Sequence, residues 1–482
     1  MQRRAIVWFR RDFRLADNPA LRAAVDGNFD GIVPVYIHAP DEESDWAPGA
    51  AQRVWQHETL SALDDALAAL GSRLVIRQGP THAALGALIE ESGATAVFWN
   101  RLYEPDIVKR DRQIEAHLEE NHPDLDVRHF QADLLNEPWA VETQSGKPYK
   151  VFTPFWKTIS QQQIRQPKPR PAELPEVWSR IGSCELDDLE LRPGKDWADK
   201  ILQHWTPGED GAHERLETFL SDAVDNYDND RDRPAVLGTS YLSPHLHWGE
   251  ISPFQVMHRT EEWVSDRSGE AIHDHVESFQ SEVGWREFSR HVLYHFPDTP
   301  DEPLDDRFKA FPWETPGDDF KAWKRGMTGI PMVDAGMREL YATGYMHNRL
   351  RMTVASFLTK NLRIAWQHGE RWFWDTLFDA DLGNNTLGWQ WAAGCGADAA
   401  PFFRIFNPAR QGERFDKQGE YVRRWVPELA ELPNKHLQEP WAAPQDALEK
   451  AGVTLGTTYP KPLVDLKASR REALEAFEQV KN

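Results

Sequence analysis

The sequence predicts an α/β N-terminal domain with a parallel sheet, followed by an all-α C-terminal domain. Three observations support this prediction. Short apolar runs alternate with amphipathic segments in residues 1–130, prolines interrupt residues 131–205, and helical periodicity continues through residues 206–482. We therefore expect two domains, at 1–130 and 206–482, joined by a long linker over 131–205.

The first 130 residues have the strand and helix alternation of a Rossmann-like sheet covered by helices on both faces. The expected strands are Ala5–Phe9, Gly31–Ile37, Arg73–Ile76, Ala94–Trp99 and Leu125–Phe130. The expected helices are Asn18–Asp26, Ala50–Leu70, His82–Glu91 and Asp106–Glu119. An ordinary dinucleotide fingerprint is absent, because RRDFRLADNPAL follows the first strand where GxGxxG would stand.

The linker carries eight prolines and an acidic block at Glu185–Glu190, and we expect Gly146–Lys157 to be an ordered part of it. The C-terminal half has no internal repeat. Its expected helices are Ala212–Asp225, Ser252–Asp266, Ile272–Tyr294, Phe320–Arg325, Met332–Ala342 and His347–His368.

Composition excludes several classes of protein. With 482 residues, 40% hydrophobic and 27% charged, the chain is an ordinary globular protein. Cys184 and Cys395 are too few for a disulfide framework, which favours a reducing compartment. There is no run of eighteen apolar residues and no signal-peptide pattern at the start, so we expect a soluble, cytoplasmic protein with no membrane contact.

Two properties of the whole sequence bear on function, the net charge and the number of tryptophans. The net charge of −22 argues against general nucleic-acid affinity, so any DNA binding requires local positive charge. Several arginines in the helical half could supply it as a basic patch: Arg286, Arg290, Arg349, Arg351, Arg404, Arg410, Arg423 and Arg424. The 21 tryptophans, 12 of them after residue 241, could be stacking platforms or electron relays, although a Trp-rich core explains the number equally well.

Hydroxyl residues precede an expected helix in GTSYLSPHLHWGEISP, residues 238–253. Thr239, Ser240 and Ser243 could bind a diphosphate there, because the free N–H groups of a helix start favour anions. A plain helix cap is the alternative. His245 and His247 are two residues apart with no further ligand set, so we expect no metal site.

Two helical segments each gather chemically useful side chains on one face, at i, i+3 and i+4. In the first, Glu282, Trp285 and Arg286 could bind a ligand or form only an exposed ion pair beside a packed ring. In the second, Asn348 and Arg351 are joined by Met352, which could line a pocket or belong to the core.

The stretch 379–408 is the most unusual in the chain. It reads DADLGNNTLGWQWAAGCGADAAPFFRIFNP, with paired acids, paired asparagines, two tryptophans and many small residues. Small residues allow a backbone to approach a flat ligand closely, and the aromatic residues and Arg404 suit stacking and phosphate contact.

Together with WFRRDFRLADNPAL near the start, segments 238–253, 282–288, 344–362 and 379–408 closely resemble the photolyase/cryptochrome family. The resemblance covers nearly the whole chain. It implies that the C-terminal domain binds FAD and damaged DNA, and that the protein is a light-dependent deoxyribodipyrimidine photo-lyase.

The resemblance also assigns roles to individual residues. It implies FAD contacts for Tyr227, Arg231, Thr239, Ser240, Leu242, Ser243, Arg286, Asn348, Arg351, Asp379, Asp381 and Asn385, with Arg351 paired to Asp379. It implies substrate contacts for Glu282, Trp285, Arg349, Met352, Trp391 and Arg404. Trp389, Trp366 and Trp313 match the tryptophan triad that passes electrons to the photoexcited flavin. Asn385 would face the central flavin ring, where a neutral amide favours the reduced anion.

Within the family, the pattern resembles enzymes for cyclobutane pyrimidine dimers. Asn348 and Met352 stand where enzymes for (6-4) products carry histidines, and Trp285 and Trp391 are lesion-stacking residues that plant cryptochromes lack. A cryptochrome photoreceptor and a (6-4) photolyase are the alternatives. Methenyltetrahydrofolate is a candidate antenna, although Pro105, Asp106 and Ile107 follow Tyr103-Glu104, shortly after which some relatives carry a folate-binding Glu. We expect a monomer.

Overall fold

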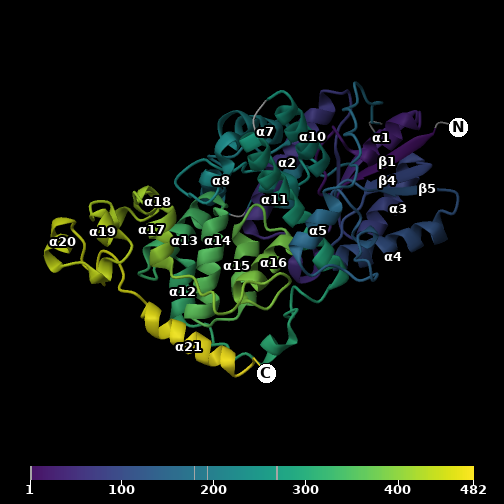
Figure 1. The fold of residues 1–482 in the computed structure, drawn as a ribbon. Helices are drawn as coiled ribbons and strands as arrows, with labels where there is room; N and C mark the ends of the chain where they lie inside the picture. The colour runs from purple at the N-terminus through teal and green to yellow at the C-terminus, as the bar shows by residue number, and fades with distance from the viewer. Residues whose placement is uncertain (1–2, 178–179, 193, 268–269, 482) are drawn as a thin grey trace. The chain divides into compact units, whose positions relative to one another are not determined.

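The computed structural model describes residues 3–177, 180–192, 194–267 and 270–481, and Figure 1 shows the fold. The chain forms two compact units. Unit 1 consists of Met1–Tyr149, Thr153–Asp222 and Ser240–Pro297. Unit 2 consists of Lys150–Phe152, Ala223–Thr239 and Asp298–Asn482. Both units are therefore discontinuous in sequence, and the division into 1–130, 131–205 and 206–482 stays a prediction.

Unit 1 contains a five-stranded parallel sheet, as the sequence predicts. Its strands are β1 (Arg4–Phe9), β2 (Gly31–His38), β3 (Val75–Gln78), β4 (Ala96–Asn100) and β5 (Asp126–Phe130). The order is β3-β2-β1-β4-β5, so the chain winds outward from β1 first to one edge and then to the other. All of β1 is buried, which explains its run of apolar residues. The edge strand β5 is only partly buried, and its sequence includes charged residues.

Four helices connect these strands: α1 (Pro19–Asp26), α2 (Ala50–Ala68), α3 (Thr81–Ser92) and α4 (Pro105–Asn121). Helices α3 and α4 pack on the face of the sheet that carries Ile6 and Trp8. Helix α1 contacts β1, β4 and β5. The predicted strands and helices of this region are confirmed to within about three residues at their ends.

The predicted linker is mostly irregular and carries short helices. These are η2 (Pro138–Ala140), α5 (Phe152–Ile159), η3 (Leu186–Leu189) and α6 (Lys195–Ile201). The remaining helices of unit 1 are α7 (Glu209–Asp222), α9 (Ser243–His247), α10 (Pro253–Ser265) and α11 (Glu270–His295), and η1 (Pro40–Trp46) follows β2. Helix α10 contacts both α7 and α11, and this contact supports the helix that bears three predicted site residues.

The regular elements of unit 2 are helices in the part of the chain that the structure describes, beside two isolated β-bridges, Glu314 with Ile364 and Leu455 with Tyr459. Its main helices are α12 (Asp318–Lys324), α13 (Pro331–Thr343), α14 (Asn348–Ser356), α15 (Trp366–Thr376), α16 (Leu382–Ala393), α17 (Pro408–Phe415), α18 (Glu420–Trp425) and α21 (Leu466–Glu478). Shorter elements are η4 (Val224–Asn226), α8 (Tyr227–Asp230), η5 (Asp306–Ala310), η6 (Phe357–Asn361), η7 (Pro427–Leu429), α19 (Asn434–Leu437), η8 (Pro440–Ala442) and α20 (Gln445–Lys450). Helices α13 to α16 lie next to one another in Figure 1.

The prediction of one helix over His347–His368 is wrong. Helix α14 ends at Ser356, a π-helical turn follows over Phe357–Asn361, and Arg363 takes a left-handed φ of 53° before α15 begins. Leu362 and Ile364, which precede and follow Arg363 at this change of direction, are both buried. The apolar period therefore continues across the break and hides it from sequence reasoning. No helix among the described residues is long and apolar enough to cross a membrane.

Candidate functional site

Helix α11 of unit 1 presents Glu282 and Trp285 differently from Arg286. The first two side chains are half-buried, whereas Arg286 is only 6% exposed and turns into the unit. The ring of Trp285 meets Phe288 edge-on, with centroids 5.7 Å apart. The interpretation of the three residues as an exposed ion pair beside a ring is therefore wrong, because Arg286 is not at the surface.

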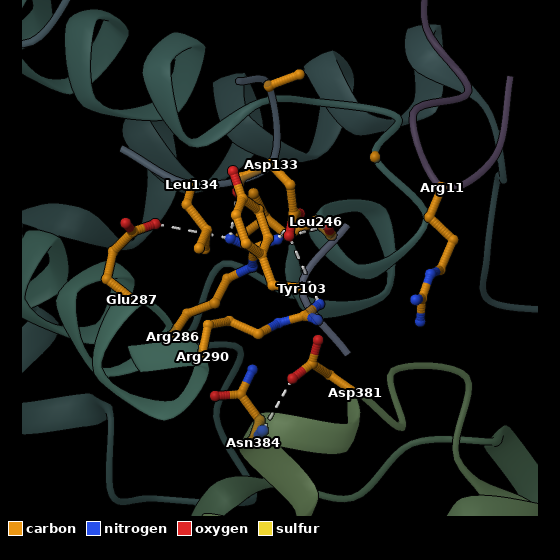
Figure 2. A network of polar contacts seen from close by, with 12 residues as sticks. Arg11, Tyr103, Asp133, Leu134, Leu246, Arg286, Glu287, Arg290, Asp381 and Asn384 are labelled. Carbon is orange, nitrogen blue, oxygen red and sulfur yellow. Dashed lines mark hydrogen bonds and ion pairs between the residues drawn. The ribbon is translucent and has the colours of Figure 1, made fainter. Parts of the chain in front are cut away.

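Arg286 belongs to a buried network of ions, shown in Figure 2. Its guanidinium pairs with the carboxylate of Asp133 and donates to the Asp133 backbone carbonyl at 2.6 Å. One turn later, Arg290 is 1% exposed and pairs with Glu104, which also binds Arg11 at 2.7 Å. Each buried charge thus has an opposite partner, the condition under which buried ions are tolerated.

Glu287 lies beside this network and accepts a hydrogen bond from the backbone N–H of Asn136 at 3.2 Å. Burial raises the pKa of Glu287 to about 8, even though Arg286 lies 3.7 Å away and favours the charged form. A carboxyl group with this pKa is mostly protonated at neutral pH, and so it packs beside the ions without adding a full negative charge.

This network corrects the expected basic patch. Arg286 and Arg290 cannot contribute to a surface patch, because their guanidinium groups are buried and neutralised. The guanidinium of Arg423 is also engaged within the protein, because it donates hydrogen bonds to the backbone carbonyls of Ala430 and Leu432. Arg404, Arg410 and Arg424 are the exposed members of the predicted set.

The segment after Ser240 in unit 1 forms the short helix α9 with Pro244 in its first turn. Tyr241 takes a left-handed φ of 54°, and the N–H of Leu242 approaches Ser240 Oγ at 3.4 Å. His245 is buried and pairs with Glu250, whose other oxygen accepts from Trp55 Nε1 at 2.8 Å. His245 therefore has a structural partner, and no group of three or more metal-ligating side chains occurs among the described residues.

The other half of the predicted diphosphate segment belongs to unit 2. Tyr227 begins α8, and the Arg231 guanidinium lies over the Tyr227 ring at 5.0 Å. Thr239 Oγ1 is buried and has no hydrogen-bond partner among the described residues. A buried hydroxyl without a partner is costly, so this atom fits an anionic group such as the expected diphosphate of FAD.

Helix α14 is positioned by a tight connection from α13. Gly344 has a φ of 66°, and a Cβ on it would lie 2.6 Å from the Phe378 ring, so no other residue fits. His347 then caps the helix by accepting from the N–H of Arg349 at 3.2 Å. On this helix Asn348 is exposed and Met352 is half-buried, so both side chains are accessible to a ligand.

The predicted pairing of Arg351 with Asp379 is confirmed. Arg351 donates to Asp379 Oδ2 at 2.8 Å and to the Met346 carbonyl at 2.7 Å. The Asp379 side chain is only 3% exposed, whereas that of Arg351 is 25% exposed. The ion pair therefore fixes a buried carboxylate behind a guanidinium that still reaches solvent.

Arg349 has a different partner from the one expected for it. Its guanidinium binds Asp232 at 2.5 Å and lies over the Phe415 ring at 4.4 Å. Binding to a DNA phosphate would require exchange of this carboxylate for the phosphate. The contact also links the segment around Arg231 to α14 within unit 2.

The stretch 379–408 begins with a capped helix. Asp381 is the N-cap of α16 and accepts from the N–H of Asn384 at 2.8 Å (Figure 2). Asn385 is 8% exposed and donates from Nδ2 to the Glu370 carbonyl at 3.0 Å, which fixes the orientation of its amide. Burial raises the pKa of Glu370 well above its usual value, and its carboxyl group accepts a hydrogen bond from Thr386 Oγ1 at 2.5 Å.

The tryptophans of this region differ in burial. Trp389 and Trp366 are 2% and 1% exposed, whereas Trp313 is half-buried and packs on Phe311 at 4.4 Å. Trp389 meets Phe373 and Trp323 edge-on, at 5.0 and 6.1 Å. In the last turn of α16, the half-buried Trp391 stacks on Phe406, with ring centroids 6.4 Å apart. Arg404, which follows the helix, is exposed.

Sequence reasoning missed the partners of these residues. Asp133, Asp232 and Glu370 each bind a predicted site residue, but none stands in a motif that the sequence analysis identified. Glu104 was noted only for its place near a possible antenna site, and its ion pair with Arg290 was not expected. Asp133 lies in the predicted linker, where acidic residues are usually solvated. No local pattern could have identified it.

The chain is similar to several known proteins. Residues 279–479 match the model of the FAD binding domain of DNA photolyase, and residues 5–175 match that of DNA photolyase. The chain is 48% identical to deoxyribodipyrimidine photo-lyase of Agrobacterium fabrum, over 99% of this chain and 98% of that protein. It is 38% identical to Cryptochrome-1 of Arabidopsis thaliana, over 99% of this chain and 70% of the relative. The crystal structure of a class III photolyase from Agrobacterium tumefaciens superposes with a TM-score of 0.95 at 46% identity, covering 100% of this chain and 98% of that one.

Proposed function

Because the chain belongs to the DNA photolyase family, we propose that it repairs cyclobutane pyrimidine dimers in DNA with the energy of light. As a member of this family it is a flavoprotein lyase, and its cofactor is FAD. When bound and reduced, FAD supplies the light-driven electron that splits the cyclobutane ring and then returns. The protein supplies placement and electrostatics.

One observation supports this proposal more than any other. In unit 2, Asp379 and Asn385, which are assigned to the flavin, are buried. Met352 and Trp391, which are assigned to the lesion, are half-buried. Asn348 is the exception to this division, because it is assigned to the flavin and is exposed. Helices α14 and α16, which carry most of them, are in contact. This separation is what a cofactor beneath a substrate pocket requires.

We assign the flavin contacts to residues whose geometry suits each part of FAD. Arg351 and Asp379 form an ion pair that would contact the flavin ring, and Asp381 would bind hydroxyl groups of the cofactor. The amide of Asn385 is fixed by the Glu370 carbonyl, and an amide has no acidic proton to give to a flavin nitrogen. Thr239, whose buried hydroxyl has no hydrogen-bond partner among the described residues, is assigned to the diphosphate together with Ser240 and Ser243. Tyr227, Arg231 and Leu242 are further proposed contacts of the cofactor.

The lesion contacts follow from accessibility. Trp285 and Trp391 offer half-buried rings on which the flipped pyrimidines can stack. Glu282 is a half-buried carboxyl group that can hydrogen-bond the base as negative charge develops on it. On the same helix, Arg286 stays a proposed flavin contact, and its ion pair with Asp133 holds α11 in place.

For the photoreduction route we propose Trp313, Trp366 and Trp389. The outer residue is half-buried and the inner two are buried, in the order that electron entry from solvent requires. Indole rings can be oxidised, which allows hopping along the chain.

A cryptochrome-type photoreceptor is the second candidate, because Cryptochrome-1 of Arabidopsis thaliana is 38% identical over almost the whole chain. Repair of (6-4) products is less well supported, since Asn348 and Met352 replace the histidines that the family comparison leads us to expect there. A monomeric state, a cytoplasmic location and a methenyltetrahydrofolate antenna stay predictions. Glu104 already binds Arg290 and Arg11, so a folate would have to bind through other groups.

A repair assay tests the proposal. The reduced holoprotein is mixed with an oligonucleotide containing one thymine cyclobutane dimer, and dimer loss is compared under blue light and in darkness. Light-dependent repair should be lost in Glu282→Ala and Trp391→Ala but retained in the control Trp441→Ala, which removes a half-buried indole elsewhere. Normal flavin photoreduction without dimer loss would contradict the proposal, and the same protein on a (6-4) oligonucleotide would then separate the two alternatives.

A further inference from the structure

A pocket of unit 2 lies outside the proposed cofactor and lesion contacts. It has a volume of about 530 Å³ and is lined by residues of α12, α13 and α15 and of the turn after α12. Four of its lining side chains are cationic: Lys321, Lys324, Arg325 and Arg338. None of the four has a role in the proposed repair reaction, so their presence in one pocket needs another explanation.

Two of these four cations have no acidic partner. Lys321 and Arg338 each form an ion pair with an acidic residue, at 2.8 Å in both cases. Lys324 and Arg325, which are consecutive at the end of α12, form no ion pair with a carboxylate in the described part of the chain. In a chain with a net charge of −22, two adjacent uncompensated cations produce a local positive potential that attracts an anion.

The same pocket is lined by an indole whose N–H group lacks an acceptor. Trp372 Nε1 is buried and makes no hydrogen bond to any described residue. The Lys324 ammonium lies 4.8 Å from the centroid of the Trp372 ring, so a cation already covers one face of this ring. Because Nε1 is an atom of that ring, the N–H and the ammonium can bond to two oxygens of a single small anion. A buried N–H costs free energy unless an acceptor of this kind reaches it.

We propose that this pocket binds a tetrahedral oxyanion of the phosphate class, which joins α12 to α15. Lys324 and Arg325 supply the positive charge, and Trp372 Nε1 donates a hydrogen bond to one oxygen. A phosphate oxygen alone satisfies the indole N–H, so the site requires no base or sugar in its ligand. A neutral ligand, in contrast, would leave both cations uncompensated. Free phosphate and a small phosphate monoester present the same oxygens, and the test below separates these two sources.

The anion would lie beside the buried aromatic residues of unit 2. Trp323 of α12 stacks on Phe373 of α15 at 6.4 Å and meets Trp389 edge-on at 6.1 Å. An anion held between Lys324 and Trp372 adds a second connection between the same two helices. Because it binds only the folded protein, it should raise the unfolding temperature as its concentration increases. This inference does not depend on the proposed repair activity.

Calorimetric titration and thermal unfolding of the FAD-loaded protein test the proposal. The probes are inorganic phosphate, glycerol phosphate and an undamaged single-stranded oligonucleotide, with sodium chloride used to hold the ionic strength constant. Phosphate should bind at one site per chain and raise the unfolding midpoint above that in chloride alone. Glycerol phosphate that binds as tightly as phosphate would extend the ligand class to monoesters, whereas much weaker binding would restrict it to the free ion.

Two pairs of variants identify the site. Lys324→Gln should weaken phosphate binding by about tenfold or more, because it removes a charge-assisted hydrogen bond. Its control Lys450→Gln neutralises an exposed lysine on α20 and should bind normally. Trp372→Phe keeps a ring but removes the N–H, and it should weaken binding by about threefold or more. Its control Trp425→Phe removes another buried N–H without a described partner, from a residue outside the pocket lining, and should bind normally.

Three results would overturn the proposal. The first is an unfolding midpoint that is the same in phosphate and in chloride of equal ionic strength. The second is a loss of binding in Lys324→Gln or Trp372→Phe that is no larger than the loss in its control. The third is an oligonucleotide that binds much more tightly than phosphate and loses affinity in Lys324→Gln, because the pocket would then be a nucleic-acid contact. Light-dependent repair should be unchanged in Lys324→Gln, which keeps this test separate from that of the photolyase activity.

Discussion

Arg286 and Asp133, which lie 153 residues apart in the sequence, form a buried ion pair in unit 1, with both side chains 7% exposed. The pair ties α11 to the irregular segment that follows β5. Because Glu282 and Trp285 are on the same helix, the position of the proposed lesion contacts depends on an acidic residue far outside their motif. The same holds for Arg290 and Glu104 one turn later.

Loss of Asp133 should destabilise the protein severely. In Asp133→Ala the Arg286 guanidinium stays buried without its carboxylate, and removing one partner of such a pair typically costs about 3–5 kcal/mol. The measurement is the free energy of unfolding by urea. Asp126→Ala is the matched control, because its ion pair with Arg128 is exposed and should contribute at most about 1 kcal/mol. Equal losses in the two variants would show that Asp133 is not a special partner.

The Arg351 and Asp379 pair should control flavin binding. Asp379→Asn keeps the size of the side chain but removes the charge that holds Arg351, so we expect purification with much less FAD. The measurement is the ratio of flavin to protein absorbance after gel filtration. The control Glu314→Gln breaks the more exposed ion pair with Arg363 and should retain full flavin. Full flavin in Asp379→Asn would place the cofactor contact elsewhere.

Glu287 should make stability depend on pH. Its pKa is raised by burial to about 8 in the folded protein, from a usual value near 4.5. The folded state therefore binds a proton that the unfolded state releases. The contribution to stability is fully present below about pH 4.5 and is lost as the pH rises through about 8.

Glu287→Gln should remove this part of the profile, because glutamine imitates the protonated carboxyl and does not titrate. Denaturation midpoints measured from pH 5 to pH 9 should fall less steeply in the variant than in the native protein. Parallel curves for the two proteins would mean that Glu287 is ionised throughout this range.

The sequence predicted those strands and helices whose hydrophobic pattern is contained within a single segment. The five strands and their helices were visible because each apolar run corresponds to one buried strand, and the i, i+3, i+4 spacing correctly grouped Asn348, Arg351 and Met352 on α14. The break after Asn361 was not visible, because buried Leu362 and Ile364 continue the apolar pattern through it.

The interior charges could not be predicted either. In the sequence, Arg286 and Arg290 look like members of a DNA-binding patch. Only the structure shows that they are neutralised, because it places Asp133 and Glu104 next to them. Whether a charged side chain is at the surface depends on partners far away in sequence. A motif does not contain that information.

Gly369 should be essential for the position of Trp389. A Cβ on Gly369 would lie 2.1 Å from the Trp389 ring, much closer than atoms can approach, so Gly369→Ala must displace either the indole or α15. Overpacking of this kind typically costs about 1–3 kcal/mol.

If Trp389 is the innermost member of the electron route, light-driven reduction of bound FAD should also slow, because hopping depends on the distance between rings. The measurement is the rate of flavin reduction under blue light with an external thiol, in samples matched for flavin content. Gly388→Ala is the control, since a Cβ there meets no atom within 4 Å. A Gly369→Ala protein that loses stability but photoreduces as fast as the control would show that Trp389 packs the core without carrying the electron.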